Sequence, residues 1–392
     1  MTTSDALPGW RDYLATLGGA DRLLDVLADR NDPLARQEVY RLFFLSLASG
    51  FNSAFMDPDL PDFTPSVSNV LNAVGTNPDF IYAGTLIDGG GTYRLSGERG
   101  DGLFVLFDFV GGGLYVTEQR GPSVGTLDLD TCTLKDGRFD VLLSAERPAG
   151  HEGDWVRLDP RARVISVRQA SYDWGEGRDA RLAIERLDRP IAPRRLDAAE
   201  IARRLALLAA YPERYAAFAM EYVASQRARG FVNRLEHDDW AGRGGLAGQH
   251  YYQGVFRLEP GEALILETEV PERVRYWNIQ LNDTLWNAID WINRQCSLNG
   301  GQAVLDSDGK FRAVIAMEDP GVPNWLDPGG HAEGSLMLRW LESSSGPEPT
   351  LTTTPLHVLR DRLPPDTAHV TPDQRQDALR RRRRGAQLRR RW

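Results

Sequence analysis

A stretch of 24 residues, 276–299, gathers an unusual number of side chains that could bind or react. Its sequence, YWNIQLNDTLWNAIDWINRQCSLN, holds three Trp, five Asn, two Asp and one Arg. If the first part is a β-strand, Trp277 and Ile279 face one side, and Asn278 and Asn282 face the other. Amide side chains both donate and accept hydrogen bonds, so such a row can bind hydroxyl or carbonyl groups. An ordinary solvent-facing strand surface accounts for the same pattern.

The second half of this stretch combines a carboxylate, a guanidinium and two indoles. Trp286 and Asp290 are one helical turn apart, and Trp291 and Arg294 follow closely. This make-up is typical of a pocket wall, in which a few polar groups lie among aromatic ones. The alternative is a helix that is packed by its Trp side chains and capped by surface charges. We expect the pocket wall.

A second group of candidates lies in residues 317–340, MEDPGVPNWLDPGGHAEGSLMLRW. Prolines and glycines there indicate a shaped loop, and loops on a rigid β scaffold often carry function. Asp319, Asp327 and His331 are residue types that bind metals, but their spacing matches no metal motif. We therefore predict no metal site and no cofactor. We expect this loop to contact residues 283–294.

Together these segments define the candidate site. The residues predicted for catalysis are Asp290, Asp319, Arg294 and His331, and those predicted for ligand binding are Trp277, Asn278, Asn282, Trp291, Asn299, Trp325 and Arg339.

Familiar catalytic templates do not fit the rest of the chain. GPSVG, residues 121–125, matches the GxSxG string, but the residues after it predict a strand and not the helix that a nucleophile elbow needs. The glycine runs DGGG and VGGG belong to no phosphate-binding motif, and no HExxH zinc helix is present. Two distant cysteines, Cys132 and Cys296, form neither a disulfide scaffold nor a CxxC site.

Composition and charge restrict the class of protein. The chain has 392 residues, 42% of them hydrophobic and 26% charged, which is typical of a soluble protein with two or three units. The net charge is −9, and residues 371–392 hold nine Arg and two Asp, so the rest of the chain carries −16. An acidic body makes nucleic-acid binding an unlikely function, apart from weak polyanion contact through the Arg-rich tail. No signal peptide and no apolar run of membrane length is seen, so we expect a cytoplasmic protein without membrane contact.

The periodicity of the apolar residues predicts an α+β fold. We expect a helical N-terminal segment over 1–60, a β-sandwich-like domain over 64–190, a helical connector over 191–232, and a jelly-roll-like β domain with the candidate site over 233–345. Asp32 and Asp197 are suited to cap helices, and Pro212 either kinks one long helix or separates two. Residues 346–392 are expected to be a linker and a disordered tail, because a run of Arg repels itself and has little to bury. Contact of the tail with the acidic body, or with a second copy of the chain, is the alternative.

The quoted stretch and DPGVPNWLDPGGHAEGSLMLRW, residues 319–340, resemble the C-terminal region of bacterial proteins grouped as domain of unknown function 1214. NPDFIYAGTLIDGGGTYRLSGERGD is similar to the first β region of that group, so the likeness covers about residues 69–341. The resemblance implies a helical start, β-sandwich units and a jelly-roll-like C-terminal part. Members have been loosely described as hydrolases. Their YWSLTLYD-like strand is YWNIQLND here, so roles of hydroxyl side chains on that strand do not carry over.

Two hypotheses of different kinds follow. The first is a hydrolase or lyase that acts on a hydroxylated, carbohydrate-like small molecule through carboxylates of the C-terminal β domain. The second is a non-catalytic binding protein that holds a hydrophobic or polyol ligand in a Trp-lined cleft. Paired carboxylates inside the main pocket would favour the first, and an aromatic cleft without them would favour the second. On the sequence alone we favour the first by a small margin.

Overall fold

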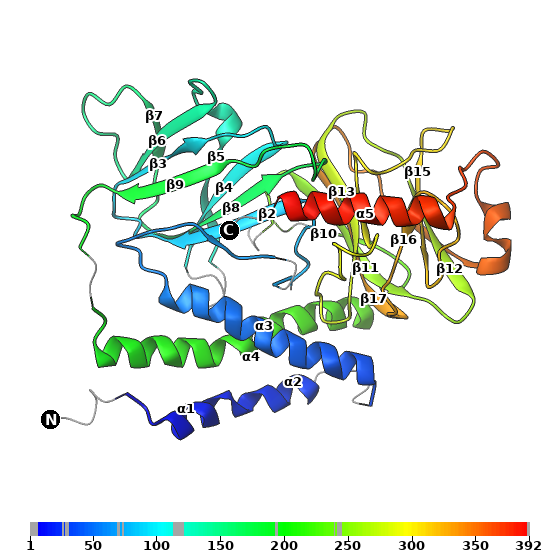
Figure 1. The fold of residues 1–392 in the computed structure, drawn as a ribbon, viewed down its shortest axis with the longest axis horizontal. Coiled ribbons are helices and arrows are strands. Elements are labelled where there is room, and N and C mark those ends of the chain that lie inside the picture. The colour runs from blue at the N-terminus through cyan, green and yellow to red at the C-terminus, as the bar shows by residue number, and fades with distance from the viewer. Residues whose placement is uncertain are drawn as a thin grey trace.

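The computed structural model describes residues 7–25, 27, 31–68, 71–72, 74–112, 121–192, 195–238, 240 and 245–389. Two β-sandwiches lie side by side, and a layer of helices lies below both in the view of Figure 1. Residues 1–6, which begin the segment that shows no signal peptide, lie outside the described residues. Gly113, the last residue of VGGG, and residues 390–392 also lie outside them.

The helices are α1 (Trp10–Thr16), η1 (Leu17–Ala20), α2 (Asp21–Asp25), α3 (Pro33–Phe55), η2 (Leu129–Thr131), α4 (Ala198–Ala228), η3 (Leu356–Arg362) and α5 (Pro372–Leu388). The strands are β1 (Thr64–Pro65), β2 (Phe80–Leu86), β3 (Tyr93–Glu98), β4 (Phe104–Gly111), β5 (Ser123–Asp128), β6 (Arg138–Ser144), β7 (Asp154–Arg157), β8 (Ala162–Ala170), β9 (Arg181–Arg186), β10 (Glu236–Asp238), β11 (Gln249–Arg257), β12 (Glu262–Thr268), β13 (Val274–Asn282), β14 (Ser297–Asn299), β15 (Phe311–Ala316), β16 (Trp325–Leu326), β17 (Glu333–Ser343) and β18 (Thr350–Pro355).

The first sandwich packs the sheet β1-β2-β8-β4-β5 against the sheet β7-β6-β3-β9. Alternate residues of the central strands point inward, as the period of two predicts. Phe107 and Val167 of one sheet meet Leu95 and Val141 of the other in one buried core. Nearly all strand pairs are antiparallel, the exception here being β6 with β7.

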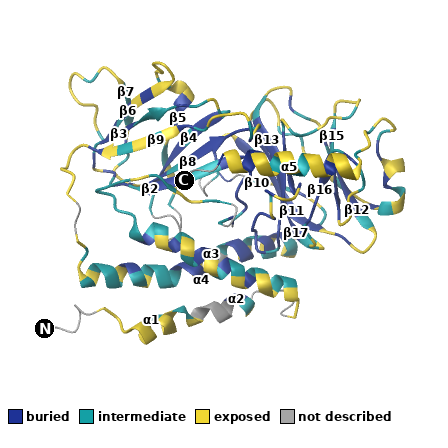
Figure 2. Ribbon diagram, viewed as in Figure 1, coloured by how far each residue is buried: buried dark blue, intermediate teal, exposed yellow. Residues whose placement is uncertain are grey.

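The second sandwich packs the sheet β10-β11-β17-β13-β14 against the sheet β16-β15-β12-β18. Its core contains Trp277 and Trp340, which are neighbours on β13 and β17, together with Leu266 and Phe311 from the facing sheet. Figure 2 shows that the buried residues follow the strands of both sandwiches, whereas α1 is largely exposed. The predicted α+β fold with antiparallel sandwich units and a helical insert is confirmed.

The helical layer rests on α3 and α4, which pack against each other. Asp32 caps α3, because its carboxylate accepts hydrogen bonds from the backbone N–H groups of Leu34 and Ala35. Asp197 caps α4 by accepting from the Glu200 N–H, and α4 continues through Pro212 as one helix of 31 residues. The second half of α4 lies on the outer face of β11, where Val223 packs against Val255. Among the described residues, no helix is long and apolar enough to cross a membrane.

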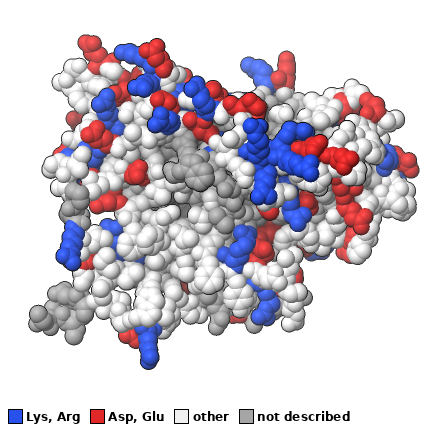
Figure 3. All heavy atoms as spheres, viewed as in Figure 1, with Lys and Arg blue, Asp and Glu red and all other residues white. Residues whose placement is uncertain are grey.

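The expectation of a disordered C-terminal tail is wrong. Residues 350–355 form β18, residues 356–362 a short helix, and residues 372–388 the helix α5, which lies across the second sandwich in Figure 1 and ends beside the first. The helix is ordered because three of its arginines do not face water: Arg375 and Arg389 are buried, and Arg382 is partly buried. The remaining arginines of the helix are exposed and form the basic patch over α5 in Figure 3.

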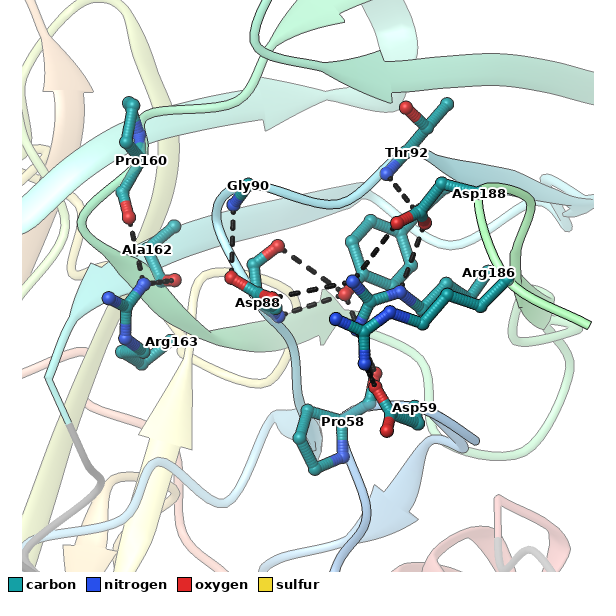
Figure 4. A network of polar contacts seen from close by, with 12 residues as sticks. Pro58, Asp59, Asp88, Gly90, Thr92, Pro160, Ala162, Arg163, Arg186 and Asp188 are labelled. Atoms are coloured by element: carbon teal, nitrogen blue, oxygen red, sulfur yellow. Dashed lines mark hydrogen bonds and ion pairs between the residues drawn. The ribbon is translucent and has the colours of Figure 1, made fainter. Parts of the chain in front are cut away.

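An ion cluster around a buried arginine joins the helical layer to the first sandwich. Arg186, at the end of β9, is only 3% exposed and pairs with Asp59 (2.7 Å), Asp88 (3.3 Å) and Asp188 (3.0 Å). Figure 4 shows the three carboxylates around this guanidinium, which also lies over the Tyr93 ring. Since Asp59 belongs to the segment that follows α3, the cluster fixes that segment to the sandwich.

Candidate functional site

The amide row of β13 lies on the opposite side of the strand from Trp277, as predicted. Trp277 packs into the core against Trp340, with ring centres 5.2 Å apart. Asn278, Gln280 and Asn282 have no exposed surface at all. The row is therefore neither a solvent-facing surface nor an open ligand platform.

The amide row binds a segment of the first sandwich. This segment, residues 75–79, runs into β2, and we call it the strap. Asn278 Nδ2 donates to Asn77 Oδ1 (3.2 Å), and Gln280 Nε2 donates to the Thr76 carbonyl (3.1 Å). A buried polar group is stable only when it is hydrogen-bonded, so the row and the strap need each other. Asn278 and Gln280 are thus explained by the contact between the sandwiches. Asn282, Asn287 and Asn293 instead bond within the second sandwich.

The strap ends in a fully buried carboxyl group. Asp79 accepts hydrogen bonds from Tyr276 (2.7 Å), Trp174 (2.9 Å) and Asn299 (2.6 Å). Burial raises the pKa of Asp79 above its ordinary value, although these donors act in the opposite direction. Burial also raises the pKa of Tyr276. The predicted binding residue Asn299 is therefore part of this interdomain network.

A tight turn after β13 places an indole next to the strap. Asp283 accepts from the backbone N–H groups of Leu285 (2.9 Å) and Asn287 (2.8 Å), and this fixes the turn. Trp286 within it has φ +62°, a left-handed conformation that is rare for a bulky residue. The Gly75 N–H donates to the Trp286 carbonyl (2.7 Å). A Cβ on Gly75 would lie 2.6 Å from Trp286 Nε1, so only glycine fits under the indole.

A cavity of about 180 Å³ lies where the helical layer meets both sandwiches. It is bordered by α3, α4, β2, β8, β11 and β17, with Trp286 in its wall. The aromatic side chains that line it are Phe80, Tyr82, Tyr211, Phe218, Trp240, Tyr251 and Trp286. Trp286 stacks on Tyr222 (4.4 Å between ring centres) and lies 5.4 Å from Trp240.

Two arginines line this cavity, and none of the lining residues in the described part of the chain is acidic. Arg339 donates to Asn278 Oδ1 (3.1 Å), Gln280 Oε1 (2.6 Å) and the Gly75 carbonyl (2.8 Å). Arg168 is 3.9 Å from Asp108, which lies behind it. The guanidinium carbon of Arg168 lies 6.0 Å from the centre of the Tyr82 ring, and that of Arg339 lies 5.8 Å from the centre of the Tyr251 ring. Burial raises the pKa of Tyr82, and the charges of the two arginines oppose this rise.

Three further polar atoms of the lining residues lack a hydrogen-bond partner among the described residues. They are Thr76 Oγ1, Gln249 Oε1 and Trp286 Nε1, and each belongs to a residue that is less than a tenth exposed. A buried donor or acceptor without a partner costs about 1–3 kcal/mol.

Some residues of the predicted composite site line a separate, open groove. The two predicted segments meet there, as expected, because Arg294 Nη1 donates to Asp327 Oδ2 (2.9 Å), although residues 283–294 form turns and not the helix that their spacing predicts. The groove is lined by Asp290, Asp319 and Trp325, and α5 closes one side of it. Its carboxylates are already bound: Asp290 accepts from Asn293, and Asp319 pairs with Arg375 of α5 at 2.8 Å.

The other predicted residues are spread over different surroundings. His331 does not line this groove and borders a recess next to α3 and α4. Trp291 packs edge-on against Trp174 (5.4 Å), and Trp325 donates from Nε1 to the Ala316 carbonyl (2.9 Å). Of the eleven predicted site residues, only Arg339 lines the cavity.

Sequence reasoning missed most of the cavity. The alternation of residues along their strands places Arg168, Tyr82 and Tyr251 on the face away from the sandwich core. This alternation is the sequence pattern that could have pointed to the cavity. Trp286 was noted, but as a helix residue one turn from Asp290. Among the described residues, no group of three or more His, Cys, Asp or Glu is placed to hold a metal.

The fold defines a two-sandwich α+β protein with a cavity at the junction of sandwiches and helices. Residues 259–345 match the model of the family described as "Protein of unknown function (DUF1214)". These residues are similar to that family, and the resemblance seen in the sequence is confirmed over them.

Solved structures extend the likeness beyond the matched region. An uncharacterized protein from Burkholderia cenocepacia is 28% identical, with a TM-score of 0.83, over 89% of this chain and 97% of that chain. A protein from Vibrio parahaemolyticus is 12% identical over 80% of this chain and 98% of that one, and its TM-score of 0.46 is too low to support a conclusion. No curated protein matches the chain.

Proposed function

We propose that the protein binds a small, largely apolar molecule in the cavity between the sandwiches and the helical layer, and does not convert it chemically. The observation that carries this proposal is the lining of the cavity, which is aromatic and contains no acidic residue in the described part of the chain. Ligand sites are mostly apolar with a few placed polar groups, and this composition fits that description. Catalysis by paired carboxylates would need acids inside the cavity.

The volume of the cavity limits the size of the ligand. An apolar protein cavity of about 150 Å³ is known to bind benzene. The cavity here, at about 180 Å³, has room for a single ring with a small substituent.

The rigidity of the wall supports binding. Trp286 keeps a strained backbone because Asp283 and Gly75 hold the turn on both sides. Strain of this kind costs about 1–3 kcal/mol and persists only where surrounding contacts enforce it. An indole held in place before the ligand arrives loses little entropy on binding.

The hydrolase or lyase hypothesis stays a prediction, and it rests on the open groove with Asp290 and Asp319. Both acids are engaged by neighbours of their own, so neither is poised to donate or accept a proton from a substrate without rearrangement. Release of nitrophenol from nitrophenyl glycosides, lost in Asp319→Asn, would support it. The cytoplasmic location is also a proposal, supported by the two free cysteines, Cys132 and Cys296.

The binding proposal is tested by filling the cavity. Ser166 on β8 lines it, and Ser96 on β3 lies on the outer groove of the other sheet of the same sandwich. Both are partly buried strand serines, so Ser166→Phe and Ser96→Phe are matched variants. Binding of single-ring compounds, both neutral and acidic, is measured by quenching of Trp fluorescence and by calorimetry.

We expect saturable binding to the wild type and to Ser96→Phe, and loss of binding in Ser166→Phe. The proposal fails if no single-ring compound binds, or if Ser166→Phe binds as well as Ser96→Phe. Circular dichroism of each variant establishes that it is folded.

A further inference from the structure

We infer that the ligand is a carboxylic acid with a compact apolar body, and that its carboxylate binds Arg339 in the wall of the cavity. This inference rests on the proposed function and names the chemical class of the ligand.

The charge of Arg339 is the central observation. Seven arginines in the described part of the chain are buried, namely Arg99, Arg168, Arg186, Arg204, Arg339, Arg375 and Arg389. Six of them have a carboxylate within 4.0 Å. Among the described residues Arg339 has only neutral acceptors, two amide oxygens and one carbonyl, although just 5% of its surface is exposed. A buried charge is costly unless it is paired, so this cation lacks the partner that every other buried arginine has.

The surroundings of Arg339 do not supply the missing charge. The nearest acid of the interdomain network is Asp79, which is separated from Arg339 by Asn77 and Asn278. Burial raises the pKa of Asp79 and so favours its neutral form. Asp108 lies next to Arg168, the second cation of the cavity. The described lining of the cavity therefore holds two positive side chains and no negative one.

Donors remain for an incoming carboxylate. A guanidinium has five N–H groups, and three hydrogen bonds of Arg339 are accounted for. These three bonds use Nη1 and Nη2 and leave the Nε–H group of Arg339 without an acceptor among the described residues. A carboxylate that binds Arg339 accepts from the remaining guanidinium N–H groups, while its apolar body lies against the aromatic wall. Charge-assisted hydrogen bonds of this kind are about twice as strong as neutral ones.

Arg339 also has a structural role, because it holds the strap through Gly75. Two variants separate this role from anion binding. Arg339→Lys keeps the charge, and Arg339→Gln keeps hydrogen-bond donors but removes the charge. The probes are benzoate and phenylacetate, each compared with its uncharged amide, benzamide and phenylacetamide, which have nearly the same shape.

For the wild type we expect each acid to bind at least about ten-fold more tightly than its amide, equivalent to about 1.4 kcal/mol. Arg339→Gln should lose this preference while still binding the amides, and Arg339→Lys should retain most of it. The inference is overturned if the amides bind the wild type as tightly as the acids, or if Arg339→Gln keeps the preference. In both of those outcomes the proposed binding function still stands. If neither acids nor amides bind, the proposed function fails and the inference with it.

Discussion

The guanidinium carbon of Arg382 lies 4.5 Å from the centre of the Trp174 ring, a cation–π contact between the last helix and the first sandwich. The same guanidinium donates to the Trp291 carbonyl (2.5 Å) and to the Ser297 carbonyl (3.1 Å) of the second sandwich. Arg389, at the end of the helix, donates to the Asp79 carbonyl (2.7 Å). The helix α5 therefore fastens the two sandwiches to each other.

Replacement of Arg382 by Ala should destabilise the protein by about 2–4 kcal/mol, because several charge-assisted hydrogen bonds and a partly desolvated cation–π contact are lost. The neighbouring Arg383 is exposed, and Arg383→Ala should change the free energy of unfolding by less than about 0.5 kcal/mol. Urea unfolding measures both. Equal effects of the two substitutions would show that α5 is not a fastening. Deletion of residues 380–392 should likewise lower the thermal midpoint by more than about 5 °C.

Replacement of Arg186 by Met should cost about 3–5 kcal/mol, because it leaves three carboxylates close together without their shared cation (Figure 4). Arg161 is the control, because its side chain is 71% exposed and it pairs with Asp159 alone. Exposed pairs contribute about 0–1 kcal/mol, so Arg161→Met should have little effect. Chemical denaturation of the two variants gives the comparison, and a loss below about 1 kcal/mol in Arg186→Met would contradict the prediction.

The buried carboxyl group of Asp79 should make stability fall as the pH rises. Its pKa in the folded protein is above the ordinary 3.8, so between these two pKa values the folded state binds more protons than the unfolded state. Stability is therefore lost as the pH increases through that window. Asp79→Asn removes the effect, since Tyr276 can turn its hydroxyl proton to Asn77 Oδ1, which is 2.9 Å away, and accept from the new amide.

The gain in thermal midpoint from Asp79→Asn should thus be larger at about pH 8 than at about pH 5. Asp308 serves as the control, because hydrogen bonds from Arg312 lower its pKa to about 2 and it is ionised at both pH values. Asp308→Asn should show the same change of midpoint at both. A gain from Asp79→Asn that shrinks as the pH rises would show the sign to be wrong.

Replacement of Asp283 by Ala should loosen the turn that carries Trp286. Three donors lose their acceptor in a buried place, which predicts a loss of about 2–4 kcal/mol. Asp290 also accepts from a backbone N–H and from an Asn side chain, but it is exposed, so Asp290→Ala should cost less than about 1 kcal/mol. The fluorescence anisotropy of the Trp residues should fall in Asp283→Ala and not in Asp290→Ala.

The sequence was sufficient to predict many of the elements and the faces of their strands. Alternation placed Trp277 in a core and Asn278 on the opposite side of β13, and Asp32 and Asp197 do cap helices as expected. These features depend on neighbours within a few residues, which a sequence shows directly.

The partner of the amide row could not be predicted, because the strap lies about 200 residues away along the chain. The tail was misread for a similar reason. A run of arginines has little to bury by itself, but Arg375 and Arg389 find carboxylates, Asp319 and Asp179, that distant segments supply. The cavity arises only when three layers come together, and no single segment carries its pattern.

The strap has a consequence for how this protein could have arisen by recombination of genes. The region that matches the family model, residues 259–345, contains the amide row but not the strap that satisfies it. In another protein without the strap, the side-chain amides of Asn278 and Gln280 in that region would lack these hydrogen-bond acceptors. The region is therefore not a free-standing module, and its inheritance is tied to a companion segment about 200 residues earlier in the chain.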